Sequence, residues 1–99
     1  MVSRRDAWSS VRVASSSPNA IAGKIFWNAF ANAGQICMAI KRVYAHEDVY
    51  LPLLHALVEL ARGVTVGDGF DPEAQMGPIN NRRQFERVID LVDDARRQG

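Results

Sequence analysis

The sequence predicts an α/β fold in which helices alternate with short strands, in the order helix, strand, helix, short strand, helix. Three segments, near 18–34, 48–63 and 81–98, repeat apolar residues at the spacing of a helix with one buried side. Two shorter segments, 40–46 and 64–66, are rich in β-branched or aromatic residues, which is typical of strands. Strands that are joined through helices pair in parallel, so we expect an incomplete parallel sheet.

The first helix is predicted to begin at Pro18, because Ser17 is a suitable N-cap and proline fits the first helical position. Gly34 is predicted to end it, as glycine commonly does. The only cysteine, Cys37, therefore lies on a loop just after this helix. The apolar stripe of the helix consists of Ile21, Ile25, Phe26, Ala29, Phe30 and Ala33.

The second helix is predicted to follow the strand at 40–46. Asp48 can cap its N-terminus, Pro52 is tolerated in a first turn, and Gly63 can close the helix. Its predicted apolar face consists of Tyr50, Leu53, Leu54, Leu57 and Ala61, with Val58 beside it.

The chain between the second and third helices is predicted to form turns, at Gly67-Asp68-Gly69 and Asp71-Pro72. A phosphate-binding loop is disfavoured, because no third glycine and no lysine follow at the required spacing. Asn80 or Asn81 is expected to cap the third helix. The apolar stripe of that helix consists of Phe85, Val88, Ile89, Val92 and Ala95.

Length and composition bound the possible functions. The 99 residues make at most one domain, and 47% hydrophobic residues could fill a small core. Twelve basic and 11 acidic residues leave a formal charge of +1, which gives no electrostatic reason to expect a nucleic acid or an anionic membrane as partner. A single cysteine cannot form an intramolecular disulfide and favours a cytoplasmic location. No apolar run approaches the roughly 20 residues that cross a bilayer.

Residues 1–17 differ from the rest of the chain in composition. Six of them are serine, and Arg4, Arg5 and Arg12 accompany a single acid, Asp6. This composition is typical of a disordered leader, and organelle transit peptides share it. We predict a disordered or non-family leader at 1–17, which a truncated gene would also explain, and the folded part of the chain at 18–99.

Cys37 is the candidate nucleophile. A reactive thiol needs thiolate character, room for a carbonyl, and hydrogen-bond donors where negative charge develops. Gly34 allows the backbone to come close, and the amide of Cys37 itself could donate to an oxyanion. An inert buried thiol is the alternative, since free cysteine is often buried. His46 and His55 have no second ligand at a suitable spacing, so we expect them at the surface and predict no metal site.

The segment Phe30–Lys41, which contains Gly-Gln-x-Cys, resembles the active-site cysteine signature of the aldehyde dehydrogenase superfamily. Several further segments follow the pattern of the family in the same order, so the resemblance covers roughly residues 18–99. Motifs in the right order are more specific than any one of them. These segments are Lys24–Trp27, Arg42–Tyr44, His46–Tyr50, Val66–Pro72, Met76–Ile79 and Gln84–Val88.

The resemblance implies a fold, an activity and a site. The fold would be a fragment of the aldehyde dehydrogenase catalytic domain. The activity would be oxidation of a small-molecule aldehyde to a carboxylic acid with NAD or NADP, in an enzyme that is a homo-oligomer. Cys37 would be the nucleophile, and Gln84 would contact the ribose on the nicotinamide side of the cofactor. Arg87 falls where many members have a lysine with a similar contact, and arginine differs from lysine in shape and donor geometry.

The resemblance also implies that parts of the family enzyme are not represented. Residues 1–17 show nothing like the Glu-Leu-Gly-Gly segment that holds the general base of the family, and the Glu-x-Phe-Gly-Pro segment would follow Gly99. We therefore expect a truncated chain that is inactive alone. Two alternatives stay open: a non-catalytic remnant that binds an intact aldehyde dehydrogenase, and a thiol module that works without a cofactor.

Overall fold

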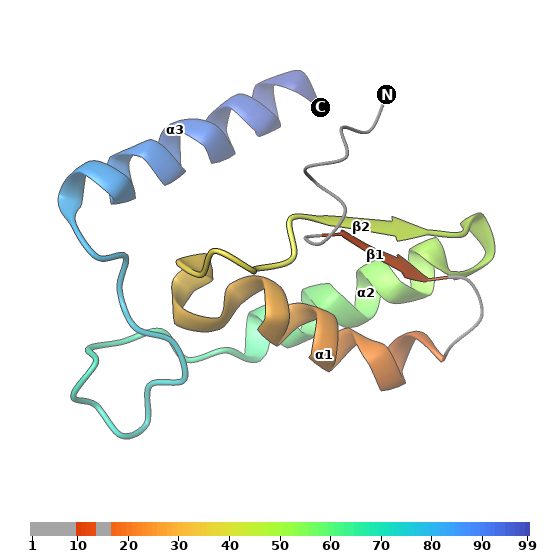
Figure 1. The fold of residues 1–99 in the computed structure, drawn as a ribbon, viewed down its shortest axis with the longest axis horizontal. Coiled ribbons are helices and arrows are strands. Elements are labelled where there is room, and N and C mark those ends of the chain that lie inside the picture. The colour runs from red at the N-terminus through yellow and green to blue at the C-terminus, as the bar shows by residue number, and fades with distance from the viewer. Residues whose placement is uncertain (1–9, 14–16) are drawn as a thin grey trace.

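The computed structural model of the chain describes residues 10–13 and 17–99. Its helices alternate with a small parallel sheet, so the predicted α/β class is confirmed (Figure 1). Along the chain the elements are β1 (Ser10–Val13), α1 (Pro18–Phe30), the 3₁₀ turn η2 (Ala31–Gly34), β2 (Arg42–Ala45), α2 (Glu47–Gly63) and α3 (Arg82–Gln98).

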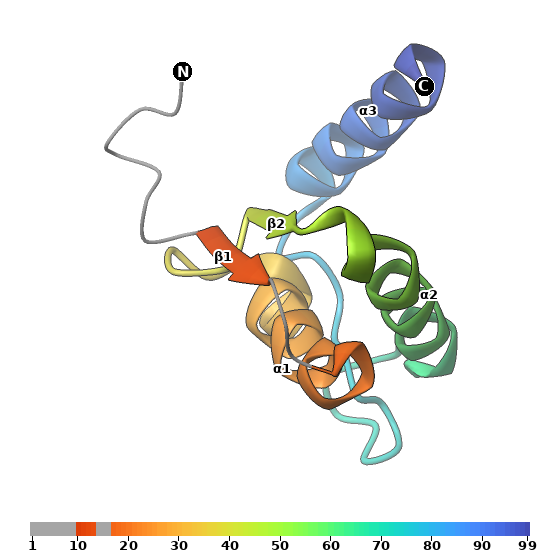
Figure 2. The same cartoon turned by 90° about the vertical axis from the view of Figure 1, so that its right-hand side faces the viewer.

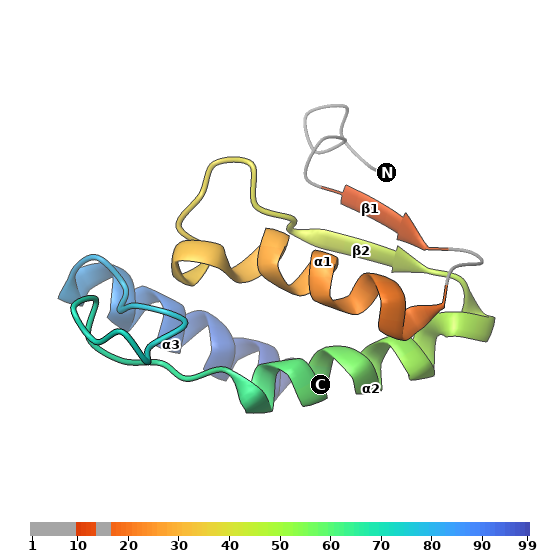
Figure 3. The ribbon, with the colours of Figure 1, turned by 90° about the horizontal axis from the view of Figure 1, so that it is seen from below.

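The strands β1 and β2 pair in parallel, with Ser10 opposite Arg42 and Val13 opposite Ala45. The backbone N–H of His46 continues the pairing by donating to the carbonyl oxygen of Val13 at 2.8 Å. Helices α1 and α2 lie side by side on one side of this sheet (Figures 2 and 3). The chain thus has two layers, and its core lies between the sheet and the two helices.

The strand β1 was not predicted, because it lies in the segment 1–17 that the composition marks as a leader. Its residues alternate as a half-buried strand does: Val11 and Val13 contribute to the core, and the residue between them is exposed. The assignment of a leader stays a prediction, and residues 1–9 and 14–16 of it lie outside the described residues.

The core is small and is built mainly by α1 and α2. Ile25 and Phe26 of the predicted apolar stripe are buried, as expected, whereas Phe30 at its end is 51% exposed. Ala22, which the prediction left out, is buried beside them. Rings support the end of this helix, since Phe26 contacts Trp27 edge-on and Phe30 in a tilted arrangement. The buried apolar residues are Val13, Ala22, Ile25, Phe26, Ala39 and Leu53.

The predicted apolar face of α2 is partly wrong. Leu53 is buried and Leu57 is half-buried, as expected, but Tyr50, Leu54, Val58 and Ala61 are exposed. Val49, Ala56 and Leu60 pack against the core in their place. Apolar residues lie around much of α2, so the side that faces α1 is chosen by packing and not by periodicity.

The start of α2 also differs from the prediction. The N-cap is His46, whose Nδ1 accepts a hydrogen bond from the backbone N–H of Asp48 at 3.3 Å. The helix therefore begins earlier than an Asp48 cap would place it. As a consequence, Pro52 lies in the second turn and not in the first. Both histidines of the chain, His46 and His55, are exposed.

The segment after α2 is mostly turns, as predicted. The expected strand at 64–66 is reduced to one parallel bridge between Val66 and Met76. The side chains of Asp68 and Asp71 each accept a hydrogen bond from the backbone two residues ahead, at 2.9 Å, which fixes the two predicted turns. This segment leads into α3.

Helix α3 stands apart from α1 and α2 (Figures 1 and 2). Asn81 caps it as expected, because its side chain accepts a hydrogen bond from the backbone N–H of Gln84 at 2.9 Å. None of its residues is buried, so its apolar stripe is open along the helix. In the part of the chain that the structure describes, no helix combines the length and apolarity that crossing a membrane requires.

Candidate active site

Cys37 lies in a tight turn between α1 and β2. The turn runs from Ile36 to Ala39 and is closed by a hydrogen bond from the backbone N–H of Ala39 to the carbonyl oxygen of Ile36, at 3.1 Å. Cys37 is exposed and free of any disulfide. The alternative of an inert buried thiol is therefore wrong for this structure, and the sulfur is open to a reagent or substrate.

The turn is held to α1 on its far side. Ala39 is buried, and the backbone N–H of Ile40 donates to the carbonyl oxygen of Asn28 at 3.0 Å. No hydrogen-bond partner of the Cys37 backbone N–H occurs among residues 10–13 and 17–99. That N–H is therefore available to an oxygen on a carbon bonded to Sγ, which is the place where an oxyanion would form.

Before this turn, three consecutive residues have positive φ values, which lie in the left-handed region of backbone dihedral angles. Asn32, Ala33 and Gly34 have φ values of 52°, 56° and 77°. The α-helix ends at Phe30, so Gly34 closes the irregular turn η2 and not the helix itself. A Cβ on Gly34 would meet only an ordinary contact at 3.5 Å, so the positive φ and not lack of space favours glycine. An alanine in this region costs on the order of 1–2 kcal/mol, so other contacts must stabilise the turn.

Gln35 provides such contacts. Its side-chain Oε1 accepts a hydrogen bond from the backbone N–H of Asn80 at 2.7 Å. Its Nε2 donates to the carbonyl oxygen of Asn32 at 2.9 Å and to that of Pro78 at 3.4 Å. Sequence reasoning assigned no role to Gln35, because nothing in local spacing indicates partners more than 40 residues ahead.

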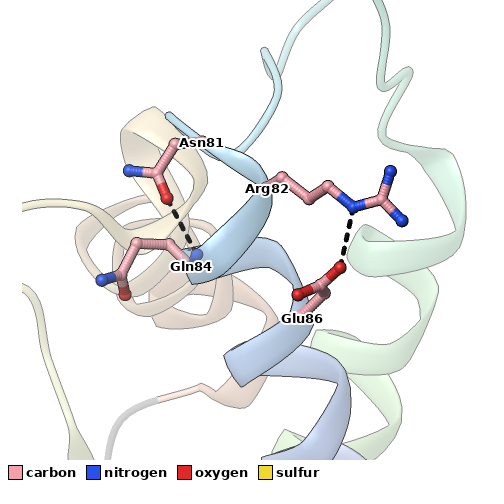
Figure 4. Close-up of polar contacts among 4 residues, drawn as sticks. All are labelled: Asn81, Arg82, Gln84 and Glu86. Atoms are coloured by element: carbon pink, nitrogen blue, oxygen red, sulfur yellow. Dashed lines mark hydrogen bonds and ion pairs between the residues drawn. The ribbon is translucent and has the colours of Figure 1, made fainter.

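Gln84 and Arg87, which we predict to contact the cofactor, lie on α3 and are distant from the cysteine turn in the sequence. Figure 4 shows the start of this helix, where the side chain of Asn81 accepts a hydrogen bond from the backbone N–H of Gln84. In the same turn Arg82 forms an ion pair with Glu86, with 2.8 Å between Nε and Oε1. Gln84 and Arg87 line a shallow polar groove of about 370 Å³ along the helix. The side-chain amide of Gln84 has no partner within the described chain, so it is available to a ligand.

A larger groove, of about 900 Å³ and mostly apolar, lies between the end of α1 and the first turns of α3. The segment that leads into α3 forms its floor. Among the residues that line it are Phe30, Ala33, Met76, Ile79, Phe85 and Val88. Across residues 10–13 and 17–99, no three side chains of His, Cys, Asp or Glu come together as a metal site requires.

Alkylation of Cys37 tests the exposure of the turn. Because the sulfur is exposed in the native turn, we expect iodoacetamide to react in the absence of urea within about threefold of its rate in urea. The reaction is followed by mass spectrometry, and the urea-treated chain is the reference. A native rate far below that reference would mean that the thiol is buried, contrary to the structure.

Comparison with known proteins gives one family. The model of the aldehyde dehydrogenase family matches residues 13–99. A probable aldehyde dehydrogenase of Pseudomonas sp. is 46% identical over 89 residues, which are 90% of this chain and 18% of the relative. The D-glyceraldehyde dehydrogenase (NADP(+)) of Thermoplasma acidophilum is 36% identical over 75 residues, 76% of this chain and 15% of that one.

Solved structures agree. PnpE from Pseudomonas sp. WBC-3 superposes with a TM-score of 0.84 at 32% identity, over 91% of this chain and 19% of PnpE, and it has also been solved with nicotinamide adenine dinucleotide. HpcC from Thermus thermophilus superposes with a TM-score of 0.85 at 26% identity, over 93% of this chain and 18% of HpcC. The chain thus spans less than a fifth of the length of each of these four proteins.

Proposed function

The chain belongs to the aldehyde dehydrogenase family, and from this premise we propose that it carries the nucleophile of an NAD- or NADP-dependent aldehyde oxidation, Cys37. The observation that carries the proposal is the cysteine turn. Its thiol is exposed and its own backbone N–H is unpaired within the described chain. A nucleophile and an oxyanion donor are therefore provided by one residue.

The chemistry of the turn follows from that pair. The thiolate of Cys37 attacks the carbonyl carbon of the aldehyde, and the electrons of the C=O double bond move to the oxygen. The N–H of Cys37 donates to this oxyanion and stabilises the thiohemiacetal. When bound, NAD or NADP accepts the hydride that leaves the former aldehyde carbon. Attack of water on the resulting thioester breaks the carbon–sulfur bond, releases the acid and restores the thiol.

Gln84 and Arg87 are the residues of this chain that would hold part of the cofactor. An exposed, unpaired amide and a guanidinium in a polar groove suit the hydroxyl groups of a ribose, but they make up only a small part of a dinucleotide site. The D-glyceraldehyde dehydrogenase (NADP(+)) of Thermoplasma acidophilum and the dinucleotide complex of PnpE support this cofactor class without choosing between the two. We propose a cytoplasmic location, because the one cysteine of this chain cannot form an intramolecular disulfide. We also propose that the complete enzyme is a homo-oligomer.

The test is transfer into a whole enzyme. Residues 18–99 replace the matching segment of the Pseudomonas relative, and reduction of NAD or NADP by a panel of aldehydes is measured. We expect the chimera to oxidise aldehydes and the 99-residue chain alone to be inactive, because a nucleophile without a bound hydride acceptor completes no redox step. A chimera that folds like its host but reduces no cofactor would overturn the proposal.

The cofactor assignment makes a separate prediction in that chimera. Gln84→Ala should raise the KM for the cofactor about 3- to 10-fold and change kcat less, since one neutral hydrogen bond to bound cofactor is lost. Gln98→Ala is the matched control, because it is the same substitution at an exposed position of α3 that lines neither groove. Equal KM values for the two variants would remove Gln84 from the cofactor site.

The open apolar stripe of α3 favours a second candidate function, association with an intact homologue. Phe85, Val88, Ile89 and Val92 are each more than 40% exposed, and apolar surface of this kind favours association. We expect the tagged chain to retain the Pseudomonas relative on a column, and Val88→Asp to abolish retention. Arg83→Asp, off the stripe, is the control. If the unchanged chain retains no relative, this candidate is discarded.

A further inference from the structure

The side chain of Gln35 joins the cysteine turn to the segment that leads into α3. We propose that Gln35 is a positioning residue, which fixes Cys37 relative to the face of α3 that carries Gln84 and Arg87. This inference rests on the proposed function, since it concerns how the same site is held together.

The contacts of Gln35 use both ends of its amide. The oxygen accepts from the backbone N–H of Asn80 at 2.7 Å, and the nitrogen donates to Asn32 at 2.9 Å and to Pro78 at 3.4 Å. The partners belong to two segments, one that is 43 to 45 residues away from Gln35 in the chain and one that is three residues away. A single side chain therefore fastens η2 to the start of the last helix.

The hydrogen bonds of Gln35 connect the cysteine turn with the face of α3 that carries Gln84 and Arg87, and few residues lie between the two. Gln35 precedes Cys37 by two positions, and Asn80 directly precedes Asn81, the cap of α3. Asn81 in turn accepts from the backbone N–H of Gln84, the link drawn in Figure 4. A shift of this lead-in segment would therefore move Gln84 relative to Cys37.

Two features of the fold require a contact such as the hydrogen bonds of Gln35. The residues just before Gln35 adopt left-handed backbone angles, a costly conformation for Ala33 that needs support from outside. Helix α3 buries no residue, so packing holds its direction only weakly. Polar contacts at its first residues must then contribute more to its placement than they would in a packed helix.

The test measures the placement directly in the whole 99-residue chain. One nitroxide is attached to Cys37, the only native cysteine, and a second to Asp90→Cys, an exposed position two turns into α3. Pulsed electron paramagnetic resonance then gives the distribution of distances between the two nitroxide labels. We expect Gln35→Ala to broaden this distribution, and in the unlabelled chain to speed hydrogen exchange of the Asn80 amide about 3- to 10-fold.

Gln75→Ala is the matched control. Gln75 also accepts a hydrogen bond from the backbone, from Thr65 at 3.0 Å, but it fastens a different loop. This variant should speed exchange at Thr65 and leave both the label distances and Asn80 unchanged. A distance distribution and an Asn80 exchange rate that are the same in Gln35→Ala as in the unchanged chain would overturn the inference.

Gln35→Glu keeps the test decisive if circular dichroism shows that Gln35→Ala does not fold. A glutamate can still accept from Asn80 but cannot donate to Asn32 or Pro78. In Gln35→Glu we expect the Asn80 amide to stay protected from hydrogen exchange and the distribution of distances between the two labels to broaden. An unchanged distance distribution would overturn the inference. Neither readout uses an aldehyde or a cofactor, so failure of the proposed function and failure of this inference are distinguishable.

Discussion

Replacing Leu53 with alanine is expected to unfold much of the chain. Leu53 is 2% exposed, lies in the middle of α2, and is one of only six buried apolar residues among those described, so its removal leaves a cavity that the small core cannot fill. Leucine-to-alanine changes at such sites cost about 2–5 kcal/mol, which is a large part of the roughly 5–15 kcal/mol that stabilises a whole domain. Urea denaturation followed by far-ultraviolet circular dichroism measures the loss.

Leu51→Ala is the matched control for this experiment. Leu51 lies two residues away in the same helix, but it is 57% exposed. The change in helix propensity is the same in both variants, so the difference between them isolates burial. We expect Leu51→Ala to change the stability by less than about 0.5 kcal/mol. Equal midpoints for the two variants would show that α2 does not pack on α1 through Leu53.

Local signals made most of the fold predictable. The presence and approximate positions of α1, α2 and α3 follow from apolar periodicity, and the cap at Asn81 follows from the preference of asparagine for that position. These signals act between residues a few positions apart, and a sequence shows them directly. Local signals predicted the helix ends less accurately. His46 caps α2 in place of Asp48, and α1 ends before Gly34.

The features that could not be predicted depend on distant partners. β1 has only four residues, and it is stabilised by pairing with β2 much further along the chain. The face of α2 that packs is chosen by α1, because apolar residues occur on several sides of the helix. In the site, the cysteine was found from its motif, whereas the contacts of Gln35 with Pro78 and Asn80 appear only in three dimensions.

Cys37→Ala is expected to abolish aldehyde oxidation in the chimera that carries residues 18–99. If the thiol is the nucleophile, no other group of the turn can form the covalent intermediate, and kcat should fall by at least about 10³-fold. Cys37→Ser should lose nearly as much although it preserves the size of the side chain, because a serine hydroxyl without a neighbouring base stays protonated. Initial rates of cofactor reduction give the comparison.

A second measurement separates loss of the nucleophile from disturbance of the turn. Quenching the reaction in acid and digesting the chimera should give a peptide with an acyl group on Cys37, and this peptide should be missing from both variants. Met38→Ala changes the exposed neighbour in the same turn, and we expect it to keep the acyl peptide and most of kcat. If the alanine variant of Cys37 still turned over aldehydes and formed an acyl peptide elsewhere, the exposed turn would serve only to shape the site. A thiol nucleophile would then have to lie outside residues 18–99, since Cys37 is the only cysteine of the chain.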